Sequence, residues 1–218
     1  MEDKEKRLLS VVVSVYNEEL VLEDFLAETQ AVLETIPWEY ELIFVNDGSQ
    51  DTSLMLLEQF VKRNSHIRLI NFSRNFGHEA AMIAGIDYSR GDGVICMDAD
   101  LQHPPACIPE IVQKFEEGYG VVNLVRTQNK DAGFFKNVTS TAFYKVLNLL
   151  SPVHFEENAS DFLAFSRAAA NVLRQAYRER VRFLRGYVQS LGFPKTTLYY
   201  EARERQAGKS KYSIGKLV

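Results

Sequence analysis

Two carboxylates two residues apart, Asp98 and Asp100, are the side chains whose spacing points most clearly to chemistry. They follow the apolar run Val94–Met97, so both come directly after a predicted buried strand. Two like charges this close repel each other unless a cation lies between them. Carboxylate and amide oxygens suit Mg²⁺ or Mn²⁺. The pattern therefore predicts a divalent-metal site with Asp98, Asp100 and Gln102 as ligands, and places His103 where it can contact those ligands.

Three other polar segments also follow apolar strands: Tyr16–Glu19, Asn46–Ser49 and Ser73–His78. Ligands of open parallel α/β sheets bind at the carboxyl ends of the strands, so these segments are predicted to share one site with the carboxylates. In the third segment a glycine opens a helix, whose N-terminus favours anions. Two alternatives stay open: Ser49 and Asp51 could cap the next helix, and the third segment could be an ordinary turn.

The elements that must position these residues alternate regularly in the first half of the chain. Near-continuous apolar strands separated by amphipathic helices indicate an α/β fold, with a mostly parallel sheet flanked by helices. The expected strands are Leu8–Tyr16, Tyr40–Val45, Ile67–Phe72, Gly93–Met97 and Gly120–Val125, and the expected helices are Leu20–Thr35, Thr52–Asn64, Glu79–Ser89 and Pro109–Glu117.

The second half is less regular, but no Pro-, Gly- or Ser-rich linker separates it from the first, which favours a single domain. The expected helices are Phe134–Leu150, Arg167–Arg178 and Val181–Leu191, and the expected strands are Asp161–Phe165 and Thr196–Tyr200.

Composition and charge narrow the class of protein. The 218 residues are 46 % apolar, which excludes a disordered chain. The net charge of −4 hides an asymmetry, because residues 178–218 carry ten basic and three acidic side chains. The basic end suggests an anionic partner. No apolar run reaches the ~18 residues of a membrane span, and the polar N-terminus does not read as a signal peptide. Cys96 and Cys107 match no metal or redox motif and are expected to be reduced, mostly buried thiols of a cytosolic protein.

Neither of the common glycine-rich phosphate loops, G-x-G-x-x-G and G-x-x-x-x-G-K-[ST], occurs in the chain. Their absence argues against a dinucleotide-dependent dehydrogenase and a P-loop NTPase.

Four segments together resemble the family 2 glycosyltransferases of GT-A (Rossmann-like) fold: Ser14–Glu19, Val45–Thr52, Ser73–His78 and Met97–Pro105. Within that family the chain looks like the polyprenyl-phosphate glycosyltransferases, the group of dolichyl-phosphate mannose synthase and the bacterial undecaprenyl-phosphate glucosyltransferases. The later segments that support this placement are Lys136–Ser140 with Phe143 and Tyr144, Ser160–Phe162, Arg182–Gly186 and Arg205–Tyr212.

The resemblance implies a role for each matching residue, within one GT-A catalytic domain over 1–218. Residues 1–125 would bind the nucleotide-sugar, residues 126–205 the acceptor, and residues 206–218 would form a basic loop and a juxtamembrane-like end, before the membrane helices that many members carry. The nucleotide-sugar set is Tyr16, Asn17, Glu18, Asp47, Gly48, Arg74, Asn75, Gly77, Asp98, Ala99, Asp100, Arg205, Ser210 and Lys211. The acceptor-phosphate set is Arg126, Lys136 and Ser140, and the catalytic set is Asp100, Asp161 and Arg205.

Some positions depart from the family pattern. Ser14 stands where a proline is usual, and His103 and Ala106 replace an Asp and a Glu that are common in bacterial members. Ser160 replaces a common glycine before Asp161. None of these changes removes a catalytic group.

The implied reaction is an inverting displacement at the anomeric carbon of a nucleotide-sugar, with a polyprenyl phosphate as acceptor. A phosphate nucleophile is largely ionised at neutral pH, since its second pKa is ~6, and needs no strong base. A hydroxyl acceptor would need one, and Asp161 is then the candidate. Alternatively, Asp161 orients the acceptor or holds the Arg182 and Arg185 region.

UDP-glucose is the favoured donor, while GDP-mannose and a UDP-N-acetylhexosamine stay open. The competing classes are a glycosyltransferase that extends a surface polysaccharide from a hydroxyl, a non-catalytic nucleotide-sugar-binding regulator and, more distantly, a nucleotidyltransferase. The expected location is the cytoplasmic face of a membrane, with an anionic bilayer surface and no nucleic acid as partner. A homo-oligomer is left open. The residues expected to face the bilayer are Arg178, Arg180, Lys209 and Lys216.

Overall fold

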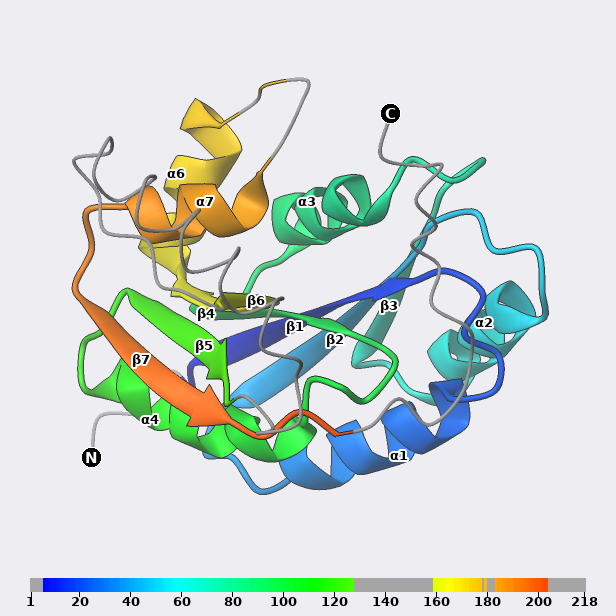
Figure 1. Ribbon diagram of the computed structural model, residues 1–218. Helices are drawn as coiled ribbons and strands as arrows, with labels where there is room; N and C mark the ends of the chain where they lie inside the picture. The colour runs from blue at the N-terminus through cyan, green and yellow to red at the C-terminus, as the bar shows by residue number, and fades with distance from the viewer. Residues whose placement is uncertain (1–5, 128–158, 178, 180–182, 204–218) are drawn as a thin grey trace, which may run out of the picture.

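The computed structural model describes residues 6–127, 159–177, 179 and 183–203. The strands in this part of the chain form one seven-stranded sheet, in the order β3-β2-β1-β4-β6-β5-β7 (Figure 1). Every neighbouring pair is parallel except the two pairs made by β6. The strands are β1 Leu8–Val15, β2 Glu39–Asn46, β3 Ile67–Asn71, β4 Gly93–Asp98, β5 Val121–Arg126, β6 Ala159–Ser166 and β7 Lys195–Tyr200.

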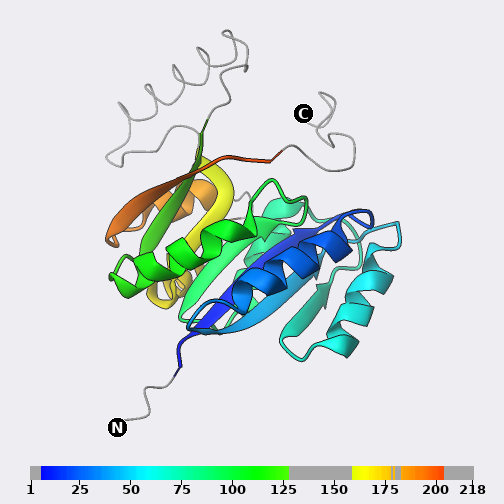
Figure 2. The ribbon, with the colours of Figure 1, turned by 90° about the horizontal axis from the view of Figure 1, so that it is seen from below.

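Helices cover both faces of the sheet, as Figures 1 and 2 show. One face carries α1 (Leu22–Leu33), α2 (Ser53–Arg63) and α4 (Ile108–Glu116), with the short 3₁₀ helix η1 (Pro105–Cys107) before α4. The other face carries α3 (His78–Tyr88), α6 (Arg167–Ala176) and α7 (Leu184–Ser190). The predicted α/β class and the mostly parallel sheet are therefore confirmed.

Each face of the sheet has its own apolar core. Phe25, Phe44 and Phe60 pack on the α1 and α2 side, whereas Phe165 lies in the core on the α3 and α6 side. All four rings are at most 1 % exposed, and burying one side chain of this size stabilises the fold by about 1.5–3 kcal/mol. A strand with a core on either face is apolar on both faces where it crosses the core, as Val11–Val13 of β1 and Leu42–Val45 of β2 are.

The observed elements match the ranges expected from the sequence to within a few residues at each end. The expected helix Phe134–Leu150 lies outside the described residues. Helix α7 begins at Leu184, three residues after the expected start. Helix η1 was not expected, since it begins at the second of two consecutive prolines and lacks helical apolar spacing.

Strand β6 departs from the parallel pattern, because it lies between β4 and β5 and runs antiparallel to both. Its side chains alternate between the two cores: Phe162 and Ala164 face one, and Leu163 and Phe165 face the other. Cys96 of β4 pairs with Leu163, so two more residues in the same register bring Asp161 opposite Asp98. The antiparallel direction thus places the start of β6 at the carboxyl end of β4.

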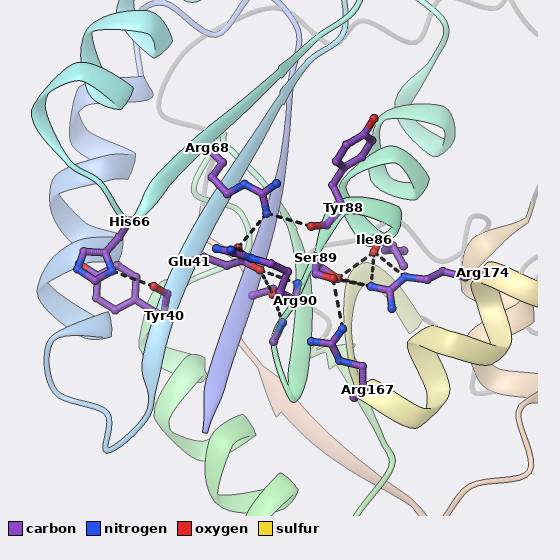
Figure 3. A network of polar contacts seen from close by, with 12 residues as sticks. Tyr40, Glu41, His66, Arg68, Ile86, Tyr88, Ser89, Arg90, Arg167 and Arg174 are labelled. Carbon is purple, nitrogen blue, oxygen red and sulfur yellow. Dashed lines mark hydrogen bonds and ion pairs between the residues drawn. The ribbon is translucent and has the colours of Figure 1, made fainter. Parts of the chain in front are cut away.

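A polar network closes the amino end of the sheet, and Figure 3 shows it from close by. Glu41 is 2 % exposed and accepts hydrogen bonds from Ser10 Oγ at 2.6 Å, from Arg90 N at 2.6 Å and from Arg68 Nη1 at 3.1 Å. Burial alone would raise the pKa of Glu41, but these hydrogen bonds outweigh it and hold the pKa below its usual range. The guanidinium of Arg174 donates to the carbonyl oxygens of Ile86 and Ser89, which ties α6 to the end of α3.

Both cysteines are free thiols, as expected. Cys96 is buried in β4, and Cys107 is partly buried. Burial raises the pKa of Cys107 to about 11, which leaves it a poor nucleophile at neutral pH. Across the described residues, no helix combines the length and the apolar character that a bilayer crossing requires.

Candidate functional site

The carboxyl ends of β1, β2, β3 and β4 lie side by side in the sheet, and the polar segments predicted from the sequence follow them. Four residues with positive φ lie in these segments: Asn17, Gly48, Gly77 and Leu101. A positive φ is rare for residues other than glycine, and strained backbone of this kind gathers at functional sites. Asn17 and Leu101, which are not glycines, therefore place backbone strain at the predicted site.

The predicted metal ligands lie at the end of β4. Asp98 is the last residue of the strand, with about one third of its side chain exposed, and Asp100 is partly exposed. Asp100 Oδ1 accepts a hydrogen bond from the amide of Gln102 at 3.1 Å. Between them Ala99 is buried and Leu101 has φ +61°, so the chain turns sharply with its apolar side chains inward. This turn leaves the two carboxylates on the solvent side.

The donor set suits a hard divalent cation. Asp98 and Asp100 offer carboxylate oxygens, which Mg²⁺ and Mn²⁺ prefer. Within the described ranges, no group of three His, Cys, Asp or Glu side chains is arranged to hold a metal ion. A cation here would therefore take most of its ligands from water and from a bound diphosphate, as is common for Mg²⁺.

Asp98 is surrounded by a hydroxyl and two imidazole rings. Ser14 Oγ donates to Asp98 Oδ1 at 3.2 Å and lies 2.9 Å from His78 Nδ1. The backbone N–H of Asp98 donates to His103 Nδ1 at 3.0 Å, so that nitrogen has no hydrogen. The ring of His103 is buried and stacks on Phe162, and burial lowers its pKa and keeps it neutral. The expected contact between His103 and the metal motif is confirmed, through the backbone of Asp98.

Hydrogen bonds join the segment after β1 to the segment after β2. The amide of Asn17 donates to Ser49 Oγ at 3.0 Å, and the amide of Gln50 donates to Asn17 Oδ1 at 2.7 Å. Glu19 Oε2 accepts from both the amide and the hydroxyl of Thr52, at 3.0 and 2.5 Å. The two segments therefore form one continuous wall of the site.

The contacts at the start of α2 show whether Ser49 and Asp51 cap this helix or contact the other site residues. Thr52 is the N-cap of the helix, and Ser49 contacts Asn17 instead. Asp51 Oδ1 accepts from the amide of Ser53 at 3.0 Å, while its Oδ2 accepts from the amide of Glu19 at 3.3 Å. Asp51 thus supports the first turn of α2 and the wall together.

Asp47 and Gly48 hold the segment after β3. Asp47 is 3 % exposed, and its two carboxylate oxygens accept from the amides of Phe76 and Gly77 at 2.7 and 3.0 Å. Gly48 has φ +68°, and a Cβ there would clash with the carbonyl carbon of Arg74. Glycine is required because of both the conformation and the close approach. These contacts fix the point where α3 begins.

Two hollows of about 400 and 430 Å³ border the segment after β2, on the scale of a small-ligand pocket. One opens toward Asn17, Glu18 and Asp51, and the other toward Arg74 and Asn75. Arg74 and Asn75 are exposed, and the guanidinium of Arg74 lies 3.9 Å from the centre of the Phe76 ring. Most of the described residues of the predicted nucleotide-sugar set therefore come together around these hollows and the end of β4.

On the opposite side of Asp98, Asp161 lies near the start of α7. Asp161 Oδ1 is 3.9 Å from Arg185 Nη1, which agrees with the predicted tie to Arg185. Glu79, in the first turn of α3, accepts from the amide of Leu184 at 3.1 Å. Burial raises the pKa of Glu79, and the charge of Asp161 adds to the rise. This group joins the beginnings of α3, β6 and α7.

Of the predicted acceptor residues, the structure describes Arg126, which is exposed at the end of β5. The predicted site residues Lys136, Ser140, Arg205, Ser210 and Lys211 lie outside the described residues.

Sequence reasoning did not place Ser14, His78 or Glu79 beside the carboxylates as individual contacts. A hydroxyl near the carboxyl end of a mostly apolar strand was the signal for Ser14. A titratable residue in the first turn of an Ala-rich helix was the signal for the other two. Neither signal identifies the partner, because the contacts span 64, 84 and 105 residues of sequence.

Comparison with known proteins agrees with this arrangement. The family model described as glycosyl transferase family 2 matches residues 10–179. The uncharacterized glycosyltransferase YkcC of Bacillus subtilis is 39 % identical over 96 % of this chain and 64 % of its own length. The bactoprenol glucosyl transferase of Shigella phage SfV is 34 % identical, over 96 % of this chain and 68 % of its own length. This chain thus spans about two thirds of these curated relatives.

Among solved structures, the mannosyltransferase PcManGT from Pyrobaculum calidifontis, in complex with GDP-Man and Mn²⁺, is similar in fold. Its TM-score is 0.62 at 17 % identity, over 93 % of this chain and 59 % of the other. An α/β sheet with this likeness, a family match over most of the chain and relatives above 30 % identity agree with one another. The chain therefore belongs to glycosyl transferase family 2.

Proposed function

We propose that this chain is an inverting glycosyltransferase that moves a hexose from a nucleotide-sugar, with UDP-glucose favoured, to a polyprenyl phosphate. The observation that carries the proposal is the pair Asp98 and Asp100 at the end of β4, in a family 2 chain 34 % identical to bactoprenol glucosyl transferase over 96 % of its length. Residues 1–125 bind the donor and residues 126–205 bind the acceptor, while Arg205, Ser210 and Lys211 close over the diphosphate.

Separate groups of residues bind the nucleoside, the metal ion and the diphosphate of the donor. The wall formed by the segments after β1 and β2 holds the nucleoside, next to the hollow lined by Asn17 and Glu18. Asp98, Asp100 and Gln102 hold Mg²⁺ or Mn²⁺, which when bound supplies positive charge for the nucleoside diphosphate leaving group. Arg205 and Lys211 add positive charge to the same group.

The acceptor side needs positive charge as well. Arg126, Lys136 and Ser140 bind the acceptor phosphate, whose ionised oxygen attacks the anomeric carbon without a strong base. Asp161, 3.9 Å from Arg185, orients the acceptor region. The reaction takes place at the cytoplasmic face of a membrane, where basic residues of the C-terminal end meet the anionic lipid surface.

The test is a transfer assay with purified protein, Mn²⁺ and a short-chain polyprenyl phosphate. UDP-glucose, GDP-mannose and UDP-N-acetylglucosamine are offered in turn, and the readout is sugar on the lipid and released nucleoside diphosphate. We expect transfer from UDP-glucose. Pyrophosphate as a product would point to a nucleotidyltransferase, and binding of the nucleotide-sugar without turnover would point to a regulator.

Two variants separate lipid phosphate from a hydroxyl acceptor. Lys136→Ala should lower transfer by more than about tenfold, because it removes a charge-assisted contact to phosphate. Asp161→Asn should reduce it less. The reverse order would favour a hydroxyl acceptor that needs Asp161 as its base.

A further inference from the structure

Two short contacts at one oxygen link Asp98 to β1 and α3, and a third contact joins the two partner side chains to each other. Asp98 Oδ1 lies 3.2 Å from Ser14 Oγ and 3.3 Å from His78 Nδ1, and these two atoms are 2.9 Å apart. All three side chains are partly buried. Among the described residues, no hydrogen bond is donated to the other oxygen, Oδ2, and its nearest imidazole nitrogen, on His103, is 3.8 Å away.

The hydrogens of these groups can be assigned from their chemistry. An ionised carboxylate only accepts, so the single hydroxyl hydrogen of Ser14 must point to Asp98 Oδ1 for that contact to be attractive. His78 Nδ1 must then carry a hydrogen, because a bare nitrogen would face two lone-pair-bearing oxygens, at 2.9 and 3.3 Å. The order of donation is His78 to Ser14 to Asp98. His103 has the opposite arrangement, since its Nδ1 accepts from the backbone of Asp98.

The position of His78 depends in turn on the donor side of the site. His78 is the first residue of α3, and the two amides just before it are held by the carboxylate of Asp47. A continuous set of contacts therefore runs from the segment after β2, through the start of α3, to the carboxylate at the end of β4.

We propose that Ser14 and His78 are positioning residues that orient the carboxylate of Asp98, so that Oδ1 is held by the protein and Oδ2 is left for a divalent cation. This inference rests on the metal site of the proposed function. Holding the carboxylate in one rotamer before the cation arrives reduces the entropy lost on binding, and removing such support commonly costs 10–100-fold in metal affinity.

The test is Mn²⁺ affinity in the presence of UDP, measured by electron paramagnetic resonance of free Mn²⁺. Ser14→Ala and His78→Leu should each weaken Mn²⁺ binding about tenfold. Ser14→Thr keeps the hydroxyl, and His78→Asn places an amide N–H near the position of Nδ1. Both should recover most of the loss, whereas a role in packing alone would not predict recovery by these polar side chains. His66→Asn and Ser65→Ala, at exposed positions in the α2–β3 connection, are matched controls that should bind as wild type.

Nitrogen NMR of the imidazole rings is an independent readout. We expect a hydrogen on Nδ1 of His78 and none on Nδ1 of His103, and Ser14→Ala should shift the first signal. Wild-type Mn²⁺ affinity in both Ser14→Ala and His78→Leu, or a bare Nδ1 on His78, would overturn the inference. If wild type itself fails to bind Mn²⁺, the proposed metal site is wrong, and the NMR result still decides whether the contacts exist.

Discussion

The carboxylates at the two ends of the sheet have different partners. At the amino end, Glu41 meets the guanidinium groups of Arg68 and Arg90 and the hydroxyl of Ser10 (Figure 3). At the carboxyl end, Asp98 meets a hydroxyl and two imidazole rings, and a second carboxylate, Asp100, follows two residues later. The fold gives Glu41 two guanidinium partners, whereas the hydroxyl and the imidazole rings around Asp98 are uncharged or weakly basic.

This difference separates stability from function. A buried carboxylate with arginine partners is already compensated and offers little to a ligand, so the amino end serves to close the sheet. Two carboxylates two residues apart repel each other, and a cation that binds between them relieves this repulsion. The backbone agrees with this division, because Asn17 and Leu101, the non-glycine residues with positive φ in the described part of the chain, both follow strands at the carboxyl end.

Asp100→Asn should have the largest effect on function and tests the role of the carboxyl end of the sheet. It removes half of the charge that a cation would meet, so we expect transfer to fall at least about 100-fold. The free energy of unfolding should not decrease, since a like-charge repulsion is relieved. Initial rates of nucleoside diphosphate release and urea unfolding measure the two quantities. The exposed Asp24→Asn on α1 is the matched control, and equal activity in the two variants would contradict the assignment.

The opposite outcome is expected for Glu41→Gln. The change removes a buried charge with three hydrogen-bonding partners, and we expect unfolding to become easier by about 1–3 kcal/mol. Binding of UDP and Mn²⁺ should stay as in wild type, because Glu41 lies at the other end of β2. Glu39→Gln, on the same strand but exposed and paired with the exposed Lys6, should change stability much less, because surface ion pairs contribute little. Equal destabilisation by both variants would show that the buried network stabilises the fold no more than an exposed ion pair does.

Gly48→Ala should affect both the site and stability. Alanine at φ +68° is strained, and its Cβ would clash with the Arg74 backbone. We expect a loss of about 1–2 kcal/mol in stability and weaker binding of UDP, because the segment after β3 must move. Gly118→Ala is the control, since Gly118 has φ +94° and a methyl group added there would have nothing within 4 Å. UDP affinity by calorimetry should fall only in the first variant, and an equal fall in both would exclude the contact as the cause.

Local apolar patterning made most of the fold predictable. The run Gly93–Met97 predicted β4, which the structure confirms. The position of Asp98 and Asp100 directly after it indicates a metal site, and this assignment stays a prediction. The direction of β6 could not be predicted in the same way. A short apolar run indicates neither the direction of a strand nor its position in the sheet. Its insertion beside β4 brings Asp161 toward Asp98, which no local spacing indicates.

The partners of Glu41 at the amino end of the sheet could not be predicted from the local sequence either. Glu41 within the apolar stretch Tyr40–Val45 signals a buried charge that needs partners. Its partners Arg68 and Arg90 lie 27 and 49 residues away, in a sequence with 25 basic side chains to choose from. Asp47 shows the same limit, because its polar segment predicted a ligand contact, while the structure also gives it the amides of Phe76 and Gly77.

The smallest expected effect is a change of the unfolding free energy with pH, which tests the charge of Glu41 at the amino end of the sheet. The folded pKa of Glu41 is lower than its unfolded value of about 4.3, so its contribution is fully present above that value. The contribution is lost as the pH falls through the folded pKa, because the protonated carboxyl is a poorer acceptor for Arg68. The difference in unfolding free energy between wild type and Glu41→Gln should therefore shrink as urea unfolding is repeated from about pH 6 to about pH 3. A difference that stays constant over this range would mean that the shape of Glu41, rather than its charge, closes this end of the sheet.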